Sequence, residues 1–242
     1  NSANDRTLVV VSHYMARPKD DLQALLAQLK PITTNILVVI NDDAHRGPAQ
    51  WLQGMDVPSL VRENTGMNIG GWNEAYQQQS DFDSYIFLQD ECVIRNADFL
   101  LAYQERLSEP GIGMIGESLN PQWDHSWSDL SSSPLNYPVQ ITPTAPPMLR
   151  TAFYLACLQN WGISPGHTGS HLRALAWGLP ATMLTAIHGF QSGRNKEECI
   201  AAKIAASKSV EQQGAQVVQV NEAPFKFIQH KEWKSDGSGK NY

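Results

Sequence analysis

Residues 85–94 read YIFLQDECVI, and this stretch gives the clearest indication of the fold. Residues 85–88 form an unbroken apolar run, which is typical of a strand buried on both faces of a sheet. Asp90 and Glu91 follow soon after, so two adjacent carboxylates are expected where the strand ends. Hard divalent cations prefer oxygen ligands, and magnesium is often held by one or two carboxylates together with substrate phosphates. The stretch therefore predicts a metal-assisted phosphate site, with a solvated acidic turn as the alternative.

Strands and helices alternate on both sides of this stretch. Further strands are expected at residues 8–12 (LVVVS), 35–40 (NILVVI), 59–62 and 111–116 (GIGMIG). Helices are expected from Pro18 onwards, after the glycine-rich turn in 63–78 (ENTGMNIGGWNEAYQQ), and after Asn96. This order predicts an α/β fold with a mostly parallel central sheet flanked by helices. Ligands of such sheets bind beyond the carboxyl ends of the strands, where the sequence places Ser12, His13, Asp42, Asp43, Asp90 and Glu91.

The second half of the chain has a less regular pattern. A long loop is expected over 122–147, which is rich in serine, proline and tryptophan. Strands are expected at 148–158, at 182–187 before His188, at 216–220 and at 225–228, and helices at 170–178 and 197–213. Residues 234–242 read as a flexible polar tail. We expect one domain over residues 1–233.

Composition excludes several classes of protein. The 242 residues carry a formal net charge of -6 and are 42% hydrophobic, which indicates a globular chain and argues against a nucleic-acid partner. No apolar run approaches the length of about 20 residues that a membrane-spanning helix needs. The three cysteines include no CxxC pair, which argues against a structural zinc site and favours a reducing compartment. The predicted location is the cytoplasm, in solution or at the membrane periphery. Because the sequence begins at Asn1 without methionine, we expect it to be part of a longer protein.

Two acidic positions after buried strands, separated by a glycine-rich helix start, resemble the GT-A fold of glycosyltransferases. The resemblance is to family 2-like enzymes, including rhamnan-synthesis-type relatives, and covers roughly residues 7–195. It implies a Rossmann-like half, 7–118, that binds a nucleotide sugar, and a half, 119–233, that binds the acceptor. It also implies a divalent metal, Mn²⁺ or Mg²⁺.

The resemblance assigns roles to residues on the donor side. The donor-binding set that it implies is His13, Asp42, Asp43, Asn64, Asn68, Gly70, Asp90 and Arg194. Within this set, Asp42 or Asp43 would hold the nucleoside and Arg194 the diphosphate. Glu91 would contact the metal as the last carboxylate of an Asp-x-Asp-type motif, although Gln89 stands at the leading position. His188 would complete the metal site, as a late histidine does in this family.

The acceptor side departs from the family pattern, because residues 131–196 contain no aspartate or glutamate. An acidic pair is usual there, whereas this chain reads PGHTGSHLRALAWG at 165–178. His167, or failing that His171, is therefore the predicted base, since imidazole titrates near neutral pH. Both histidines could instead cap or pack a helix start, and Glu117, Asp124 or Asp129 could supply the base.

Two further features of the second half bear on the acceptor and the leaving group. Cations in the acid-free segment would stabilise the charge on a departing diphosphate; they include Arg150, Arg173, Arg194 and Lys196. Trp123, Trp127 and Trp161 could form a platform for an acceptor sugar, or could bury the long loop against the core.

The predicted function is transfer of a sugar, hexosyl or deoxyhexosyl, from a nucleotide diphosphate to a hydroxyl of a growing glycan or a glycolipid. The resemblance implies an inverting reaction assisted by a metal, in polysaccharide biosynthesis. The alternative is a non-catalytic GT-A-like module that binds a nucleotide or glycan within a larger glycan-assembly protein. A nucleotidyltransferase is disfavoured, because residues 12–20 (SHYMARPKD) lack the glycines of its usual loop.

Overall fold

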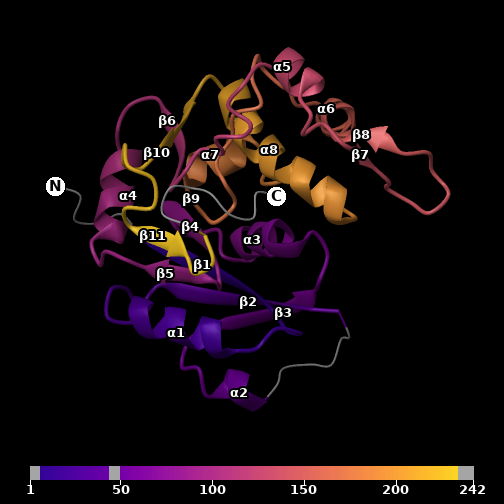
Figure 1. The fold of residues 1–242 in the computed structure, drawn as a ribbon. Helices are drawn as coiled ribbons and strands as arrows, with labels where there is room; N and C mark the ends of the chain where they lie inside the picture. Colours follow the sequence, from indigo (N-terminus) through magenta and orange to yellow (C-terminus); the bar gives the residue numbers. More distant parts are fainter. Residues whose placement is uncertain (1–5, 44–49, 234–242) are drawn as a thin grey trace.

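The computed structural model describes residues 6–43 and 50–233. Its centre is a seven-stranded sheet with the order β10-β6-β9-β4-β1-β2-β3 (Figure 1). The strands are β1 (Thr7–Tyr14), β2 (Ile36–Asp42), β3 (Ser59–Glu63), β4 (Ser84–Gln89), β6 (Ile112–Gly116), β9 (Ala176–Pro180) and β10 (Gln216–Gln219). Only β9 runs antiparallel to its neighbours, β4 and β6. The α/β fold with a mostly parallel sheet is thus confirmed.

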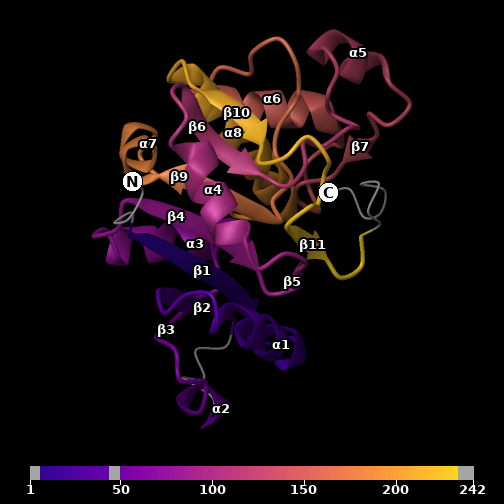
Figure 2. The same ribbon diagram turned by 90° about the vertical axis from the view of Figure 1, so that its left-hand side faces the viewer.

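Helices cover both faces of this sheet, because its central strands bury side chains on both sides (Figure 2). Val9 and Val11 pack with α1 (Asp20–Leu29) and α4 (Phe99–Leu107) on one face. Leu8 and Val10 pack on the other face with α3 (Met67–Gln78), α7 (Ala181–Ala186) and α8 (Lys196–Gln212). The remaining short helix of the first half is α2 (Gln50–Gln53).

A separate apolar cluster joins α8 to α5 (Trp127–Ser132) and α6 (Arg150–Asn160). The segment predicted as a long loop, 122–147, therefore contains α5 and most of a hairpin. This hairpin pairs β7 (Pro138–Val139) with β8 (Met148–Leu149) and projects from the body of the molecule (Figure 1).

Three predicted elements of the second half are wrong. Most of the apolar segment 148–158 is helical, because its buried residues recur at the spacing of one helix face: Arg150, Thr151, Tyr154, Cys157 and Leu158. Residues 182–187 lie mostly in α7 rather than in a strand. Pro180 precedes that helix at its N-cap, a place where a fixed proline backbone is tolerated.

The third correction concerns 170–178, predicted as a helix. Its last residues begin β9, the antiparallel strand between β6 and β4. Gly178 allows the close packing there, since a Cβ atom at this position would lie 2.9 Å from the Ile115 side chain. The predictions at 197–213 and 216–220 are confirmed as α8 and β10.

The last described residues return to the carboxyl end of β4. Here β11 (Ile228–His230) pairs antiparallel with β5 (Cys92–Ile94). It begins at the last residue of the strand predicted at 225–228 and ends two residues beyond it. Glu117 anchors this return, because the backbone N–H groups of Phe227 and Ile228 each donate to its Oε1 at 3.0 Å. Tyr103 donates to its other oxygen, and burial raises the pKa of the Glu117 carboxyl.

The tail predicted at 234–242 lies outside the described residues. Within the described ranges, no helix is both long enough and apolar enough to cross a membrane.

Candidate functional site

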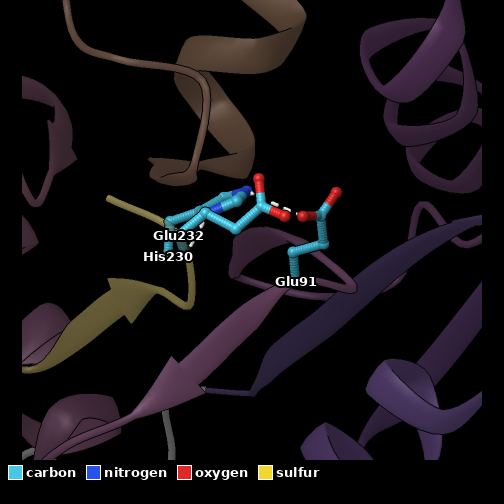
Figure 3. Close-up of side chains that lie close together, drawn as sticks. All are labelled: Glu91, His230 and Glu232. Carbon is cyan, nitrogen blue, oxygen red and sulfur yellow. Dashed lines mark hydrogen bonds and ion pairs between the residues drawn. The ribbon is translucent and has the colours of Figure 1, made fainter. Parts of the chain in front are cut away.

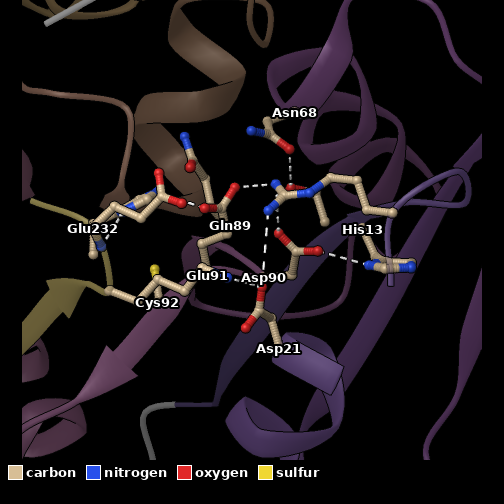
Figure 4. Close-up of polar contacts among 12 residues, drawn as sticks. His13, Asp21, Asn68, Gln89, Asp90, Glu91, Cys92 and Glu232 are labelled. Carbon is tan, nitrogen blue, oxygen red and sulfur yellow. Dashed lines mark hydrogen bonds and ion pairs between the residues drawn. The ribbon is translucent and has the colours of Figure 1, made fainter. Parts of the chain in front are cut away.

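The carboxyl ends of β1 and β4 are tied together by buried polar contacts (Figure 4). His13 Nδ1 lies 2.7 Å from Asp90 Oδ2, and both side chains are almost completely buried. The Ser12 hydroxyl donates to Asn68 Oδ1 at 2.7 Å and so connects β1 to the first turn of α3. The structure therefore brings together His13, Asn68 and Asp90, three residues predicted to bind the donor.

Glu91 extends from the same strand end toward the last described residues of the chain. Its carboxylate faces His230 and Glu232, and one potential ligand atom from each residue lies within 4.8 Å of the others (Figure 3). His230 Nε2 lies 3.2 Å from Glu91 Oε2. The backbone N–H of Glu232 donates to His230 Nδ1, so the neutral ring carries its proton on Nε2. That proton would have to leave Nε2 before this nitrogen could ligate a cation.

His230 is also fixed by its aromatic neighbour, since its ring stacks on Trp233 with centroids 4.5 Å apart. Burial lowers the pKa of His230, and Glu91 opposes that shift. The two carboxylates supply the oxygen ligands that Mn²⁺ or Mg²⁺ prefers and the imidazole adds a nitrogen donor, so the residues present fit a divalent cation.

Arg17 occupies the other side of Glu91. Its guanidinium donates to Glu91 Oε1 and lies 3.7 Å from Asp90 Oδ1 and 3.8 Å from Asp21 Oδ2. The hydrogen bond to Glu91 raises the pKa of Arg17. Both oxygens of the Glu91 carboxylate are therefore engaged, one by Arg17 and one by His230.

The predicted nucleoside-binding residues follow β2. Asp43 accepts hydrogen bonds from the Tyr14 hydroxyl and, at 2.9 Å, from Asn64 Nδ2; these bonds lower the pKa of the Asp43 carboxyl. Asp42 is buried as the last residue of β2. Position 70, in the first turn of α3, needs a glycine, because a Cβ atom on residue 70 would lie 2.0 Å from the carbonyl oxygen of Thr65 in the preceding turn.

Three adjoining pockets, of about 340, 290 and 280 Å³, form what we call the central cleft. Each shares lining residues with the next, Gly66 and Lys196 among them at one junction, and Asn68 and Gln89 at the other. The cleft runs from Asn64 to the group around Glu91.

Positively charged side chains line the cleft along its whole length. They are Arg194, Lys196, Lys203 and Arg173. Burial, together with the charges of Arg173 and Lys196, lowers the pKa of Lys203 to about 8. Arg173 lies with its guanidinium 3.9 Å from the centroid of the Trp233 ring, and burial lowers its pKa to about 10. The middle of the cleft is thus suited to an anionic group.

Gln89 lines the same part of the cleft, where the family motif would place an aspartate. Its side-chain amide donates to the carbonyl oxygen of Ala174. Because Gln89 is neutral, it does not offset the positive charge of Lys203, which lines the same part of the cleft.

Two residues predicted at the metal and diphosphate lie apart from Glu91. His188 is exposed and lies two residues after α7, whose N-cap residue Pro180 pairs with Ser84 at the opposite end of β4 from Glu91. The structure thus contradicts His188 as a partner of Glu91, and His230 occupies that place. Arg194 lines the far pocket, where it pairs with Glu198 at 2.9 Å.

The predicted base and acceptor platform are also placed differently. His171 is buried, its Nδ1 lies 2.7 Å from the carbonyl oxygen of Gly169, and burial lowers its pKa to about 4. His167 is exposed and its carbonyl oxygen accepts from the backbone N–H of Trp127. Neither histidine lines the central cleft.

Trp123 and Trp127 are buried in the cluster around α6, which contradicts the platform and supports the alternative that they bury the loop. Trp161 is half-buried beside the same cluster.

The sequence reasoning missed five residues of the site: Arg17, Lys203, His230, Glu232 and Trp233. The segment FIQHKE, 227–232, carries the signal that could have found two of them, because a histidine and an acid follow an apolar stretch. The same pattern, an apolar stretch followed by a histidine, led the sequence analysis to place the metal at His188, but the residues before His188 form a helix. Lys203 could be placed only after α8 was known to line the cleft.

Comparison with protein-family models gives no match for this chain, and comparison with curated proteins gives none. Solved structures do match. A mannosyltransferase from Pyrobaculum calidifontis, in complex with GDP-mannose and Mn²⁺, has a TM-score of 0.53 and 13% identity, over 88% of this chain and 54% of that one. The chain thus spans about half the length of that enzyme.

A glucosyl-3-phosphoglycerate synthase from Mycobacterium tuberculosis, in complex with uridine diphosphate, has a TM-score of 0.52 and 11% identity, over 90% of this chain and 72% of that one. The same synthase in complex with Mn²⁺, uridine diphosphate and phosphoglyceric acid also scores 0.52. These likenesses show the fold: the chain has a GT-A-like fold, the one that nucleotide-sugar transferases share.

Proposed function

We propose that this chain is a glycosyltransferase that moves a sugar from a nucleotide diphosphate donor to a hydroxyl acceptor with the help of a divalent metal. One observation carries the proposal. The central cleft combines a carboxylate and imidazole group at one end with cationic side chains along its length. A nucleotide diphosphate needs this combination, because its phosphates are bound by cations and by a metal.

The donor would lie along the cleft. Asp42, Asp43 and Asn64 would hold the nucleoside, near the start of α3. Lys196 and Lys203 would bind the diphosphate, and a lysine with a pKa near 8 still carries most of its charge at neutral pH. His13 would act indirectly, by fixing Asp90 in the buried pair at 2.7 Å.

Glu91, His230 and Glu232 would hold the metal, which would offset the negative charge that develops on the leaving diphosphate. Arg173 and Lys203 would stabilise the same charge from the cleft wall. His167 remains the predicted base for an inverting displacement, and a growing glycan remains the predicted acceptor. The family 2 relationship also remains a proposal.

The test is a thermal-stability screen of the nucleoside diphosphates, each with and without Mn²⁺. A diphosphate present at about 100 times its dissociation constant adds about 2.7 kcal/mol to the free energy of unfolding. We expect one base to give the largest rise in melting temperature, and Mn²⁺ to increase it. A flat response to every diphosphate would contradict a donor site.

Lys203→Met and Lys208→Met form a matched pair for this screen. Both lysines lie on α8, but Lys208 pairs with Glu211 at 3.1 Å and does not line the cleft. We expect Lys203→Met to weaken diphosphate binding about tenfold, since it removes one charge-assisted contact. Equal binding by the two variants would contradict the role given to Lys203.

A non-catalytic GT-A-like module is the second candidate. The carboxylates that line the central cleft, Glu91 and Glu232, both belong to the proposed metal group. Among the described residues that line the cleft, this leaves no carboxylate to act as the base, which favours a module that binds without catalysis. Slow metal-dependent hydrolysis of the bound donor would support the enzyme. Tight donor binding without hydrolysis or transfer would support the module.

A further inference from the structure

Arg17 lies beside the proposed metal group of Glu91, His230 and Glu232. It lies in the turn between β1 and α1, where its backbone N–H donates to the carbonyl oxygen of Tyr14 at 2.9 Å. From there its guanidinium reaches three carboxylates, those of Glu91, Asp90 and Asp21. The Arg17 side chain thus places a positive charge against the oxygen of Glu91 that His230 does not contact.

A guanidinium and a divalent cation cannot both sit against one carboxylate without repulsion. Like charges a few ångströms apart repel each other, and they do so more strongly near a protein surface than in bulk water. Mn²⁺ carries two charges, so a guanidinium held on Oε1 of Glu91 lowers the affinity of the same carboxylate for a cation, even for one that binds at Oε2.

The local contacts allow Arg17 to withdraw. Its side chain is 36% exposed, whereas the Glu91 side chain is 12% exposed and is also held by His230. Asp21, at 3.8 Å and 30% exposed, offers the guanidinium a second carboxylate on the solvent side. Glu91 would therefore stay in place while Arg17 moves away from it.

We propose that Arg17 is a built-in competitor of the divalent cation for Glu91, so that it weakens metal binding when no nucleotide is present. The proposal rests on the metal site of the proposed function. A nucleotide diphosphate would shift the balance toward the metal, because its phosphate oxygens add ligands for the cation and negative charge. Metal and donor would then bind as a pair.

The experiment is a titration of the nucleotide-free protein with Mn²⁺, in which the electron paramagnetic resonance signal reports free Mn²⁺. Arg17→Gln is compared with Lys231→Gln as the matched control. Lys231 is 37% exposed and its Nζ contacts the same Asp21, but its side chain does not contact the Glu91 carboxylate. Both variants remove one positive charge from this cluster.

We expect Arg17→Gln to bind Mn²⁺ about tenfold more tightly than the wild type, which corresponds to one charge-assisted hydrogen bond. Lys231→Gln should tighten binding by no more than about threefold, through general electrostatics. An equal gain in both variants would overturn the proposal, because removal of any nearby charge would then suffice. Weaker binding by Arg17→Gln would also overturn it, since Arg17 would then be positioning Glu91 for the metal.

Glu91→Gln separates this proposal from the proposed function. If the wild type binds Mn²⁺, Glu91→Gln abolishes that binding and Arg17→Gln leaves it unchanged, the metal site stands and the competition fails. If the wild type and Arg17→Gln bind no Mn²⁺, or Glu91→Gln binds it as the wild type does, the metal site and the competition both fail.

Discussion

His171 offers a sharp test of the correction made to the predicted base. The side chain is buried beside Trp123, with ring centroids 6.0 Å apart, and its Nδ1–H donates to the carbonyl oxygen of Gly169. Burial lowers its pKa from 6.5 to about 4, and the charge of Lys208 acts in the same direction. The folded protein therefore holds a neutral imidazole that the unfolded chain protonates more readily.

The sign of the pH effect follows from this difference. Because the folded pKa is depressed, the stability contributed by neutral His171 is complete above pH 6.5 and is lost as the pH falls toward 4. Between pH 6.5 and pH 5, each pH unit costs about 1.4 kcal/mol of unfolding free energy, so the loss at pH 5 is about 2 kcal/mol.

Urea denaturation at pH 7.5 and pH 5.0 measures this loss. We compare the wild type with His171→Asn, whose amide can still donate to Gly169, and with His167→Asn as the exposed control. The wild type and His167→Asn should lose about 2 kcal/mol more than His171→Asn between the two pH values. If all three proteins lose the same stability, His171 is not a buried neutral imidazole and the argument that removes it from catalysis fails.

Two further substitutions test how the site is built. Glu117→Ala should lower the free energy of unfolding by about 3 kcal/mol, because it leaves two buried backbone N–H groups without an acceptor, whereas Glu117→Gln should cost much less; chemical denaturation distinguishes them. Gly70→Ala should reduce both the stability and the diphosphate binding, since its Cβ would meet the Thr65 carbonyl oxygen at 2.0 Å. Gly54→Ala, whose nearest contact would be at 3.7 Å, should change neither. Melting temperatures with and without a nucleoside diphosphate measure both effects, and equal values for the two variants would contradict the role given to Gly70.

The first half of the fold could be predicted from the sequence because its strands are continuous apolar runs. Buried parallel strands such as β1, β2 and β4 need such runs, and helices with one apolar face separate them. The positions of the carboxylates could be predicted as well, because the end of each apolar run marks the end of a strand. Asp90 and Glu91 therefore lie where the sequence predicted them.

The second half could not be predicted in the same way, because its elements depend on contacts from distant segments. Apolar residues at 148–158 suit a strand by composition, yet packing of α6 against α8 buries one helical face. Likewise, β9 becomes a strand by inserting between β4 and β6, which lie far away in the sequence. Local propensity is a weak guide where tertiary contacts decide the structure.

The histidine of the proposed metal group was misplaced for the same physical reason. His188 and His230 each follow an apolar stretch, and only the sheet topology distinguishes them. The helix before His188 begins after Pro180, at the end of β4 opposite Glu91, whereas Glu117 holds the segment before His230 next to Glu91.

The return of β11 to β5 also has a consequence for how the protein is made. Glu91 emerges from the ribosome well before His230 and Glu232, and the bond between Glu117 and Ile228 closes a loop of 111 residues. Most of the sheet can form while this last segment is still being synthesised, but the proposed metal ligands cannot meet until the segment is released. Since distant pairings form slowly, the central sheet forms before the proposed metal group is assembled.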